Sequence, residues 1–278
     1  MTLIGCFVTP HPPIIVPAVG RGRLSEVMAT VEAMRHLGQE AQVLEPDTIV
    51  LLSPHAPLDP DRMSVGVADR YQGSLAMFGA PESAADLQGD VELAEAIARE
   101  AVGRGVPVRP LSGRNGVVEL DHGSLVPLLF LVEHLPRAPR LVLLSFSFLR
   151  TVDHLEFGRA VGAALAASSR RVLYVASGDL SHRLTPDAPA GYSPRGRDFD
   201  DEVVAAFHQG DANALLTIPE TLLLAAGECG YRSLVVLFGV LDGRSWSTRL
   251  LSYEGPFGVG YLVGAVDLGD GSPMEAVP

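Results

Sequence analysis

Thr48-Ile49-Val50-Leu51-Leu52-Ser53-Pro54-His55-Ala56-Pro57 joins an uninterrupted β-type run to a histidine that stands between prolines. Apolar runs without polar alternation are typical of strands covered on both faces of a sheet. The same order recurs at the start of the chain, where Leu3-Ile4-Gly5-Cys6-Phe7-Val8 precedes Thr9-Pro10-His11-Pro12-Pro13. Each proline ring restricts its own φ and disfavours helical conformation in the residue before it. The repeat therefore predicts two buried strands that each end in a rigid loop, a suitable place for a metal-ligating histidine.

Strand-like and helix-like segments alternate along the rest of the chain, and no domain boundary stands out. We expect further strands at residues 106–108, 140–146, 171–176, 248–253 and 259–266. We expect helices at residues 24–40, 91–102, 124–134, 155–167, 198–209, 212–216 and 222–241. Residues 63–79 show no helical period and predict a hairpin or an insertion at the sheet edge. Apolar strands separated by helices favour an α/β fold with a mainly parallel central sheet flanked by helices.

Composition narrows the class of protein. The chain has 278 residues, of which 47% are hydrophobic and 19% charged, and a formal net charge of -12. A negative charge with scattered basic residues argues against nucleic acid or an anionic membrane surface as a partner. No apolar run approaches the roughly 20 residues that a membrane helix needs. Only Cys6 and Cys229 occur, which excludes a disulfide framework and predicts a cytoplasmic location.

Four histidines share a similar sequence context. His11 and His55 follow predicted strands, His182 follows another in Ser177-Gly178-Asp179-Leu180-Ser181-His182, and His122 stands in Leu120-Asp121-His122-Gly123. Ligands of open α/β sheets bind outside the carboxyl ends of the strands, so these side chains could converge there. The other histidines lie on or beside predicted helices among charged neighbours, where a solvated or capping role is expected: His36, His134, His154 and His208.

A carboxylate in an apolar segment is a further candidate. Glu228 stands in Ala225-Ala226-Gly227-Glu228-Cys229-Gly230. Burial of a lone carboxylate costs several kcal/mol unless a cation or hydrogen bonds compensate it. Two histidines and one carboxylate are the ligand set of non-haem Fe(II) oxygenases. Glu228 could equally cap the helix that follows it, and the spacing leaves both roles open.

The ordered set of motifs resembles the class III extradiol ring-cleavage dioxygenases, the LigB-like family, and within it the branch related to the Memo proteins. The motifs that carry the resemblance are Thr9-Pro10-His11-Pro12-Pro13, Ser53-Pro54-His55, Asp121-His122-Gly123, Gly178-Asp179-Leu180-Ser181-His182 and Gly227-Glu228. The resemblance implies a single α/β domain around a mixed sheet, which we place at residues 1–268, with a frayed tail at residues 269–278. It implies His11, His55 and Glu228 as iron ligands, His182 as the acid/base, and His122 as a histidine beside the metal that orients oxygen.

Two positions depart from a simple reading of that resemblance. Memo-type proteins place a cysteine near the third ligand position, and Cys229 adjoins Glu228, so either side chain could face the metal. A thiolate would favour softer metals and disfavour oxygen activation. Asp179 could reach the metal itself, although we expect it to orient His182, because a carboxylate beside a catalytic imidazole fixes its tautomer. Residues 184–197, rich in Pro, Gly and Asp, follow His182 as a loop that could close over substrate.

The function that the resemblance implies is that of an Fe(II)-dependent extradiol dioxygenase acting on a catechol or an aminophenol with O2. Zinc or another divalent metal remains an alternative cofactor. The alternative function is that of a Memo-like protein that binds metal or a partner without ring cleavage, and a zinc-dependent hydrolase is a third class. We expect a small aromatic substrate and O2 as partners and a homo-oligomeric state, and the resemblance to two-subunit dioxygenases leaves room for a second small subunit.

Overall fold

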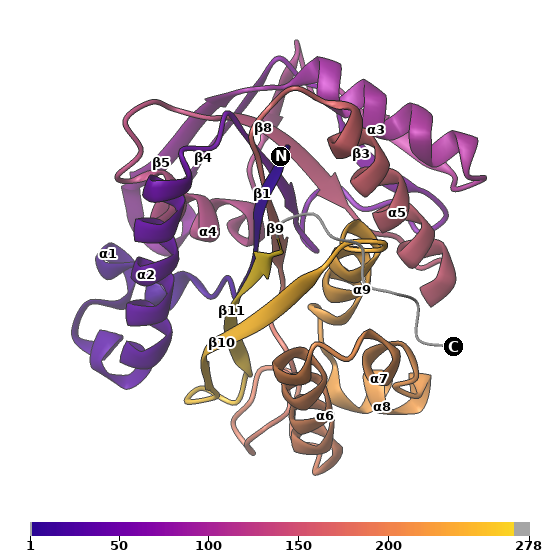
Figure 1. Ribbon diagram of the computed structural model, residues 1–278. Coiled ribbons are helices and arrows are strands. Elements are labelled where there is room, and N and C mark those ends of the chain that lie inside the picture. Colours follow the sequence, from indigo (N-terminus) through magenta and orange to yellow (C-terminus); the bar gives the residue numbers. More distant parts are fainter. Residues whose placement is uncertain (1, 270–278) are drawn as a thin grey trace.

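Four neighbouring parallel strands form the centre of the computed structural model, which describes residues 2–269 (Figure 1). They are β1 (Leu3–Thr9), β9 (Val172–Ser177), β2 (Thr48–Leu52) and β8 (Arg140–Ser145). All residues of β2 and β9 are buried, and β1 and β8 each have a single residue that is not. Because these strands are covered on both faces, their sequences lack polar alternation.

The sheet has eight strands, because two more strands lie on each side of this centre, and the first of them on each side pairs antiparallel with its central neighbour. The added strands are β11 (Tyr261–Leu268) and β10 (Trp246–Glu254) beyond β1, and β3 (Met63–Gly66) and β6 (Val108–Leu111) beyond β8. The predicted class, a single α/β domain with a mainly parallel, mixed sheet, is confirmed. The expected frayed tail lies outside the described residues, apart from Gly269.

Helices cover both faces of the sheet (Figure 1). α2 (Met28–Leu44) and α4 (His122–Val132) pack on one face. α3 (Val91–Gly103), α5 (Thr151–Ala167) and α9 (Tyr231–Val240) pack on the other. The remaining helices are shorter or peripheral: α1 (Pro17–Gly20), α6 (Arg195–Gln209), α7 (Ala212–Leu216), α8 (Glu220–Ala226) and the 3-10 turns η1 (Pro13–Ile15), η2 (Arg21–Val27) and η3 (Ala76–Phe78).

Strand β2 shows how the sequence builds the two layers. Val50 and Leu52 join the hydrophobic cluster on the α5 side, whereas Ile49 and Leu51 join the cluster on the α2 side. Successive side chains of a strand point to opposite faces, so a strand with a helix layer on each face must be apolar at every position. The core therefore consists of two clusters separated by the sheet.

A second, three-stranded sheet contains β5 (Ala80–Gln88), β4 (Arg70–Leu75) and β7 (Val117–Glu119), in that order. Only part of this region was predicted. The expected hairpin at residues 63–79 divides between β3, which joins the large sheet, and the hairpin of β4 and β5. In β5 the exposed positions carry Pro, Glu, Ala, Asp and Gln, residue types that are depleted in strands or neutral there, so this strand could not be predicted.

The prediction of one helix at residues 222–241 is wrong. The chain forms α8 and α9, and the break lies at residues 227–230. Gly227 ends α8 with a left-handed φ of 61°, a conformation that glycine adopts at helix ends without steric cost. The break places Glu228 and Cys229 at the carboxyl edge of the sheet, where the backbone N–H of Cys229 donates to the carbonyl of Asp179 just after β9.

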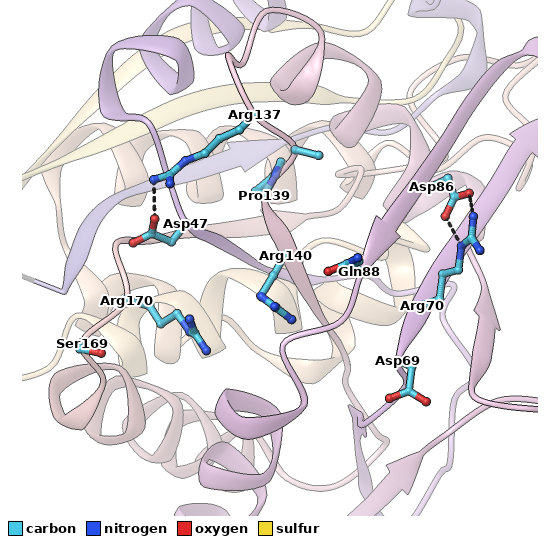
Figure 2. Close-up of a pocket in the computed structure, with 11 residues that line it drawn as sticks. Asp47, Asp69, Arg70, Asp86, Gln88, Arg137, Pro139, Arg140, Ser169 and Arg170 are labelled. Carbon is cyan, nitrogen blue, oxygen red and sulfur yellow. Dashed lines mark hydrogen bonds and ion pairs between the residues drawn. The ribbon is translucent and has the colours of Figure 1, made fainter.

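The amino edge of the central strands borders a charged cavity of about 960 Å³ (Figure 2). Asp47, Arg140 and Arg170 line it at the starts of β2, β8 and β9. Its charged groups pair with one another, as Arg137 does with Asp47 at 2.6 Å. None of the four candidate histidines lines this cavity. Within residues 2–269 there is also no helix with the length and hydropathy to span a bilayer.

Candidate metal centre

Three adjacent strands of the central sheet deliver the candidate residues to one edge. β1, β9 and β2 are neighbours and parallel, so their carboxyl ends meet. His11 follows β1, His55 follows β2, and Asp179 and His182 follow β9. His122 arrives differently, as the first residue of α4. The structure thus brings together the histidines that the sequence singled out, at the edge where α/β sheets bind ligands.

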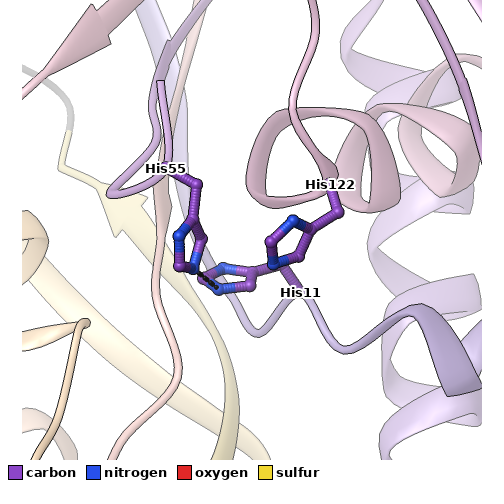
Figure 3. A group of neighbouring side chains, drawn as sticks. All are labelled: His11, His55 and His122. Carbon is purple, nitrogen blue, oxygen red and sulfur yellow. Dashed lines mark hydrogen bonds between the residues drawn. The ribbon is translucent and has the colours of Figure 1, made fainter. Parts of the chain in front are cut away.

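The imidazoles of His11, His55 and His122 converge on one point (Figure 3). One ring nitrogen from each lies within 4.8 Å of the others. Nε2 of His11 and Nε2 of His55 are 3.1 Å apart, and the ring centroids of His55 and His122 are 4.4 Å apart. His11 is buried, His122 is half-buried and His55 is exposed, so the cluster reaches solvent on the His55 side.

Hydrogen bonds fix the tautomer of His11. The Oγ of Ser177 lies 2.6 Å from the carbonyl oxygen of Gly123, to which it must donate its proton. The same Oγ lies 2.9 Å from Nδ1 of His11 and therefore accepts a hydrogen bond from it. With the proton on Nδ1, Nε2 of His11 presents a lone pair to the cluster, which is the state of a metal-ligating histidine.

Asp121 connects the loop of His55 to the start of α4, which carries His122. Its carboxylate caps α4 by accepting from the backbone N–H of Ser124 at 3.0 Å, and such a cap satisfies a helix donor that would otherwise lack a partner. It also accepts from the hydroxyl of Ser53 at 2.7 Å, and that hydroxyl in turn accepts from the backbone N–H of His55. One carboxylate therefore holds the positions of both His55 and His122.

The histidines of the site are neutral near pH 7. Burial lowers the pKa of His11 well below its usual 6.5, and the nearby imidazoles lower it further. Burial also lowers the pKa of His55, His122 and His182, partly opposed at His55 and His122 by the Asp121 carboxylate. Neutral imidazole is the form that binds metal or accepts a proton.

Asp179 lies against His11. Its Oδ1 accepts from the backbone N–H of His11 at 2.9 Å, and its Oδ2 is 3.8 Å from Nε2 of His11. Burial raises the pKa of Asp179 to about 7. We expected this carboxylate to orient His182. In the described chain its contacts orient the Pro10-His11 loop, and it has no hydrogen bond to the His182 ring.

Glu228 is turned toward the helix that follows it. Its carboxylate accepts from the backbone N–H of Tyr231 at 2.6 Å and lies 3.8 Å from the guanidinium of Arg232. Burial raises its pKa to about 7. Among residues 2–269, the group of side chains able to share one metal ion does not include Glu228. The geometry thus matches the capping role that the sequence left open.

Cys229, the next residue, faces the histidines. Its Sγ lies 3.7 Å from Nε2 of His11 and accepts from the backbone N–H of Asp179 at 3.3 Å. Burial raises the pKa of this thiol well above its usual value. The contact between the loop of Asp179 and the loop of Cys229 depends on Gly178, because a Cβ there would lie 2.2 Å from the Cα of Gly230. The two loops could not touch with any larger residue at that position.

His182 lies near the cluster without belonging to the convergent group. It lies close enough that a positive charge on its ring would lower the pKa of His11 and His55. Its Nδ1 is buried and has no hydrogen-bond partner among the described residues. The loop after it is fastened to the fold: Leu184 donates to Gly258 at 3.0 Å, and Ala190 donates to the carbonyl of His182 at 3.2 Å. These bonds hold the start of the 184–197 segment beside the site.

The arrangement suits a divalent metal ion. Two imidazole nitrogens that bind one ion at about 2.1 Å with a right angle between them are about 3.0 Å apart, close to the 3.1 Å between His11 and His55. Both rings are neutral, and the tautomer of His11 is fixed with Nε2 directed at the cluster. His11, His55 and His122 could hold the ion and leave positions for other ligands. The donor set therefore fits a divalent metal ion.

Sequence reasoning missed the residues that orient these ligands. Ser177, Ser53 and Asp121 were visible in the sequence only as parts of the histidine motifs. Ser177 is the last residue of β9 and pairs with Thr9 across β1, two residues before His11. This pairing could have identified Ser177 as a neighbour of His11. It could be inferred only if the order of the strands in the sheet was known.

The chain is similar to known proteins. A protein-family model described as the catalytic LigB subunit of aromatic ring-opening dioxygenase matches residues 5–264. Protein CA_C1420 of Clostridium acetobutylicum is 35% identical over 268 residues, which are 95% of this chain and 57% of that protein. The chain thus spans little more than half the length of this relative. The 3,4-dihydroxyphenylacetate 2,3-dioxygenase of Escherichia coli is 27% identical over 237 residues, 78% of this chain and 83% of that protein.

A solved structure shares the fold. The crystal structure of the uncharacterized protein JW3007 from Escherichia coli K12 superposes with a TM-score of 0.67 at 19% sequence identity. The match covers 94% of this chain and 99% of that one. The whole described domain therefore has a known architecture.

Proposed function

The chain belongs to the LigB family of aromatic ring-opening dioxygenases, and from this premise we propose that it is a non-haem Fe(II)-dependent extradiol dioxygenase of catechols or aminophenols. The observation that carries the proposal is the convergence of three neutral imidazoles at the carboxyl edge of the sheet. A site with several nitrogen ligands and open positions is what non-haem iron oxygenases require.

We propose His11, His55 and His122 as the residues that hold the metal. The ion would polarise the ortho oxygens of a catechol and supply the redox capacity that O2 requires. Glu228 remains the ligand that the resemblance implies. Its hydrogen bond from the backbone N–H of Tyr231 and its ion pair with Arg232 support a structural role instead. Ser177 and Asp121 hold the imidazoles in place, so that little reorganisation is needed when the metal binds.

His182 is the proposed acid/base. Its lowered pKa keeps the ring neutral near pH 7, so it can accept the proton of a substrate hydroxyl. The ring is partly exposed, so a substrate hydroxyl can reach it. The same imidazole would return the proton as the aromatic ring of the substrate opens. Asp179 supports this chemistry indirectly, because it fixes the loop of His11.

Oxygen consumption by metal-loaded protein tests the proposal. The protein, stripped of metal, would be loaded anaerobically with Fe(II) and exposed to O2 with a panel of catechols and aminophenols that includes 3,4-dihydroxyphenylacetate. We expect uptake of one O2 per substrate and a yellow ring-opened product, and none with Zn(II) in place of Fe(II). Full Fe(II) occupancy without oxygen uptake across the panel would contradict the proposal.

One observation favours a second candidate function, a Memo-like metal-binding protein without ring cleavage. The thiol of Cys229 lies 3.7 Å from Nε2 of His11, and a thiolate ligand disfavours oxygen chemistry. Cys229→Ser separates the two candidates. The dioxygenase reading predicts that the variant keeps Fe(II) and oxygen uptake. The second candidate predicts that metal affinity falls and that the wild-type protein consumes no oxygen.

The partners and location remain predictions. We propose a small aromatic molecule and O2 as the substrates, and a homo-oligomer in the cytoplasm. Light scattering of the purified protein gives the oligomeric state, and co-purification of a small polypeptide would reveal a second subunit.

A further inference from the structure

The tip of the β4–β5 hairpin places an exposed phenylalanine beside the histidine cluster. The ring of Phe78 meets the ring of His122 edge to face, with centroids 5.8 Å apart and planes at 64°. His122 stands in turn against His55, at 4.4 Å between centroids. Phe78 is thus an aromatic ring next to the imidazoles that we propose as metal ligands.

The exposure of this tip has no explanation in the packing of the fold. Phe78 is 37% exposed and Met77 is 86% exposed. Among the large exposed apolar side chains of residues 2–269, these are the only two adjacent in sequence. Single exposed apolar side chains are common on protein surfaces, whereas neighbouring ones at the border of a polar site point to a ligand.

The tip is also held in place on both sides. Leu75 and Ala80, which flank it, pair with each other across the hairpin and are buried. The carbonyl of Gly79 accepts a hydrogen bond from the guanidinium of Arg21 at 3.4 Å. Phe78 is therefore presented at a fixed position, which lowers the entropy cost of contact with a ligand.

We propose that Phe78, with Met77 beside it, is the apolar wall against which the aromatic ring of the substrate packs. The inference rests on the proposed function and deepens it, because it names a residue that selects planar aromatic rings. A catechol whose hydroxyl groups lie at the histidine cluster would have its ring next to Phe78. Aromatic rings prefer edge-to-face or offset stacking, and the Met77 thioether makes favourable contacts with ring edges.

Binding of 4-nitrocatechol to the Zn(II)-loaded protein tests this inference without any turnover. The probe changes its absorption spectrum on binding to a metal, and zinc does not react with O2. We expect Phe78→Ala to weaken 4-nitrocatechol binding by about 3- to 10-fold, the loss typical of one aromatic contact. Phe78→Trp should restore binding, and Phe78→Leu should restore it only in part, because leucine keeps apolar area without a ring.

Phe148→Ala is the matched control. Phe148 is also exposed, at 63%, but its ring lies 5.6 Å from the guanidinium of Arg232 and not against a histidine. This variant should bind 4-nitrocatechol as the wild type does, and Zn(II) affinity should be unchanged in every variant.

The outcomes separate this inference from the proposed function. If wild type and Phe78→Ala bind 4-nitrocatechol equally, the aromatic contact is overturned while the metal site stands. If Phe78→Ala binds more weakly but the Fe(II)-loaded wild type consumes no O2 with any catechol, the contact stands and the ring-cleavage function fails. If the Zn(II)-loaded wild type does not bind 4-nitrocatechol, both are overturned.

Discussion

Ser177 accepts a hydrogen bond from Nδ1 of His11 at 2.9 Å while it donates to the carbonyl of Gly123 at 2.6 Å. The serine hydroxyl thereby decides which nitrogen of His11 faces the cluster. It also ties β9, which ends at Ser177, to the first turn of α4, where His122 stands.

Ser177→Ala should weaken metal binding by roughly 10- to 100-fold, the usual effect of losing a hydrogen bond that orients a metal-ligating histidine. The reason is that Nδ1 of His11 loses its acceptor, so Nε2 no longer presents a lone pair in a fixed direction. Competition with a chelator measures the affinity for Zn(II). Ser233→Ala is the control, because it removes another buried hydroxyl, bonded to the carbonyl of Ser177 at 2.8 Å. Equal losses in both variants would show a packing effect and not an effect on His11.

The third metal ligand can be identified by comparing His122→Ala with Glu228→Ala. We expect His122→Ala to lose stoichiometric metal, as His11→Ala and His55→Ala should, since the three rings converge. Glu228→Ala should keep the metal and lose about 0.5 to 2 kcal/mol of unfolding free energy, because the N–H of Tyr231 loses its acceptor. Metal analysis and urea unfolding give the two quantities. Loss of metal from folded Glu228→Ala would restore Glu228 as the ligand.

His182→Ala should retain metal at wild-type stoichiometry and lose on the order of 10²- to 10⁴-fold in turnover, the range for removal of a positioned acid/base. The ring of His182 lies outside the convergent group of the described chain, so metal binding does not depend on it. Steady-state oxygen uptake and metal content are measured on the same sample. A metal-free variant would make His182 a ligand and would reopen the role of His122.

Asp200 should make stability depend on pH. It is fully buried, accepts from the backbone N–H of Ser181 at 2.8 Å and from the hydroxyl of Tyr253 at 2.6 Å, and burial raises its pKa from 3.8 to about 6. A raised pKa in the folded state means that the neutral acid favours folding. This contribution is complete below pH 3.8 and is lost as the pH rises through about 6.

Relative to Asp200→Asn, the wild type should therefore lose on the order of 3 kcal/mol of unfolding free energy between pH 4 and pH 7. Urea unfolding at several pH values measures the difference. Glu202→Gln removes an exposed carboxyl from the same helix and should run parallel to the wild type. If the Asp200→Asn curve also runs parallel to the wild type, Asp200 has no raised pKa.

The sequence was sufficient to predict a sheet with helices on both faces. Its strongest signal was the lack of polar alternation in β1, β2, β8 and β9, which follows from burial of these strands on both faces. It failed for β5, whose exposed positions carry charged and polar side chains. It also failed at Gly227, where one left-handed residue divides an apolar segment into two helices. Apolar residues continue at helical spacing on both sides of Gly227, so the break could not be predicted from the pattern.

The candidate site was predictable as far as its residues follow strands. His11 and His55 could be located because prolines fix their loops directly after β1 and β2. The choice between Glu228 and Cys229 could not be made, because it depends on side-chain direction within a four-residue connection. His154, expected to be solvated, is buried and lies 2.9 Å from the carbonyl of Arg150, since α5 begins earlier than its apolar period indicated.

The pairing of β1 with β9 also affects synthesis of the protein on the ribosome. His11 receives its orienting bond from a residue 166 positions later in the chain, and the Cys229 thiol beside it comes 218 positions later. A nascent chain that exposes the first Pro-His loop therefore has no preformed site with which to capture metal. Contacts of such long sequence separation form late, because loop closure costs entropy before they contribute stability. Metal insertion would thus follow synthesis of β9, and a truncated product that ends before β9 would not compete for the cell's supply of metal.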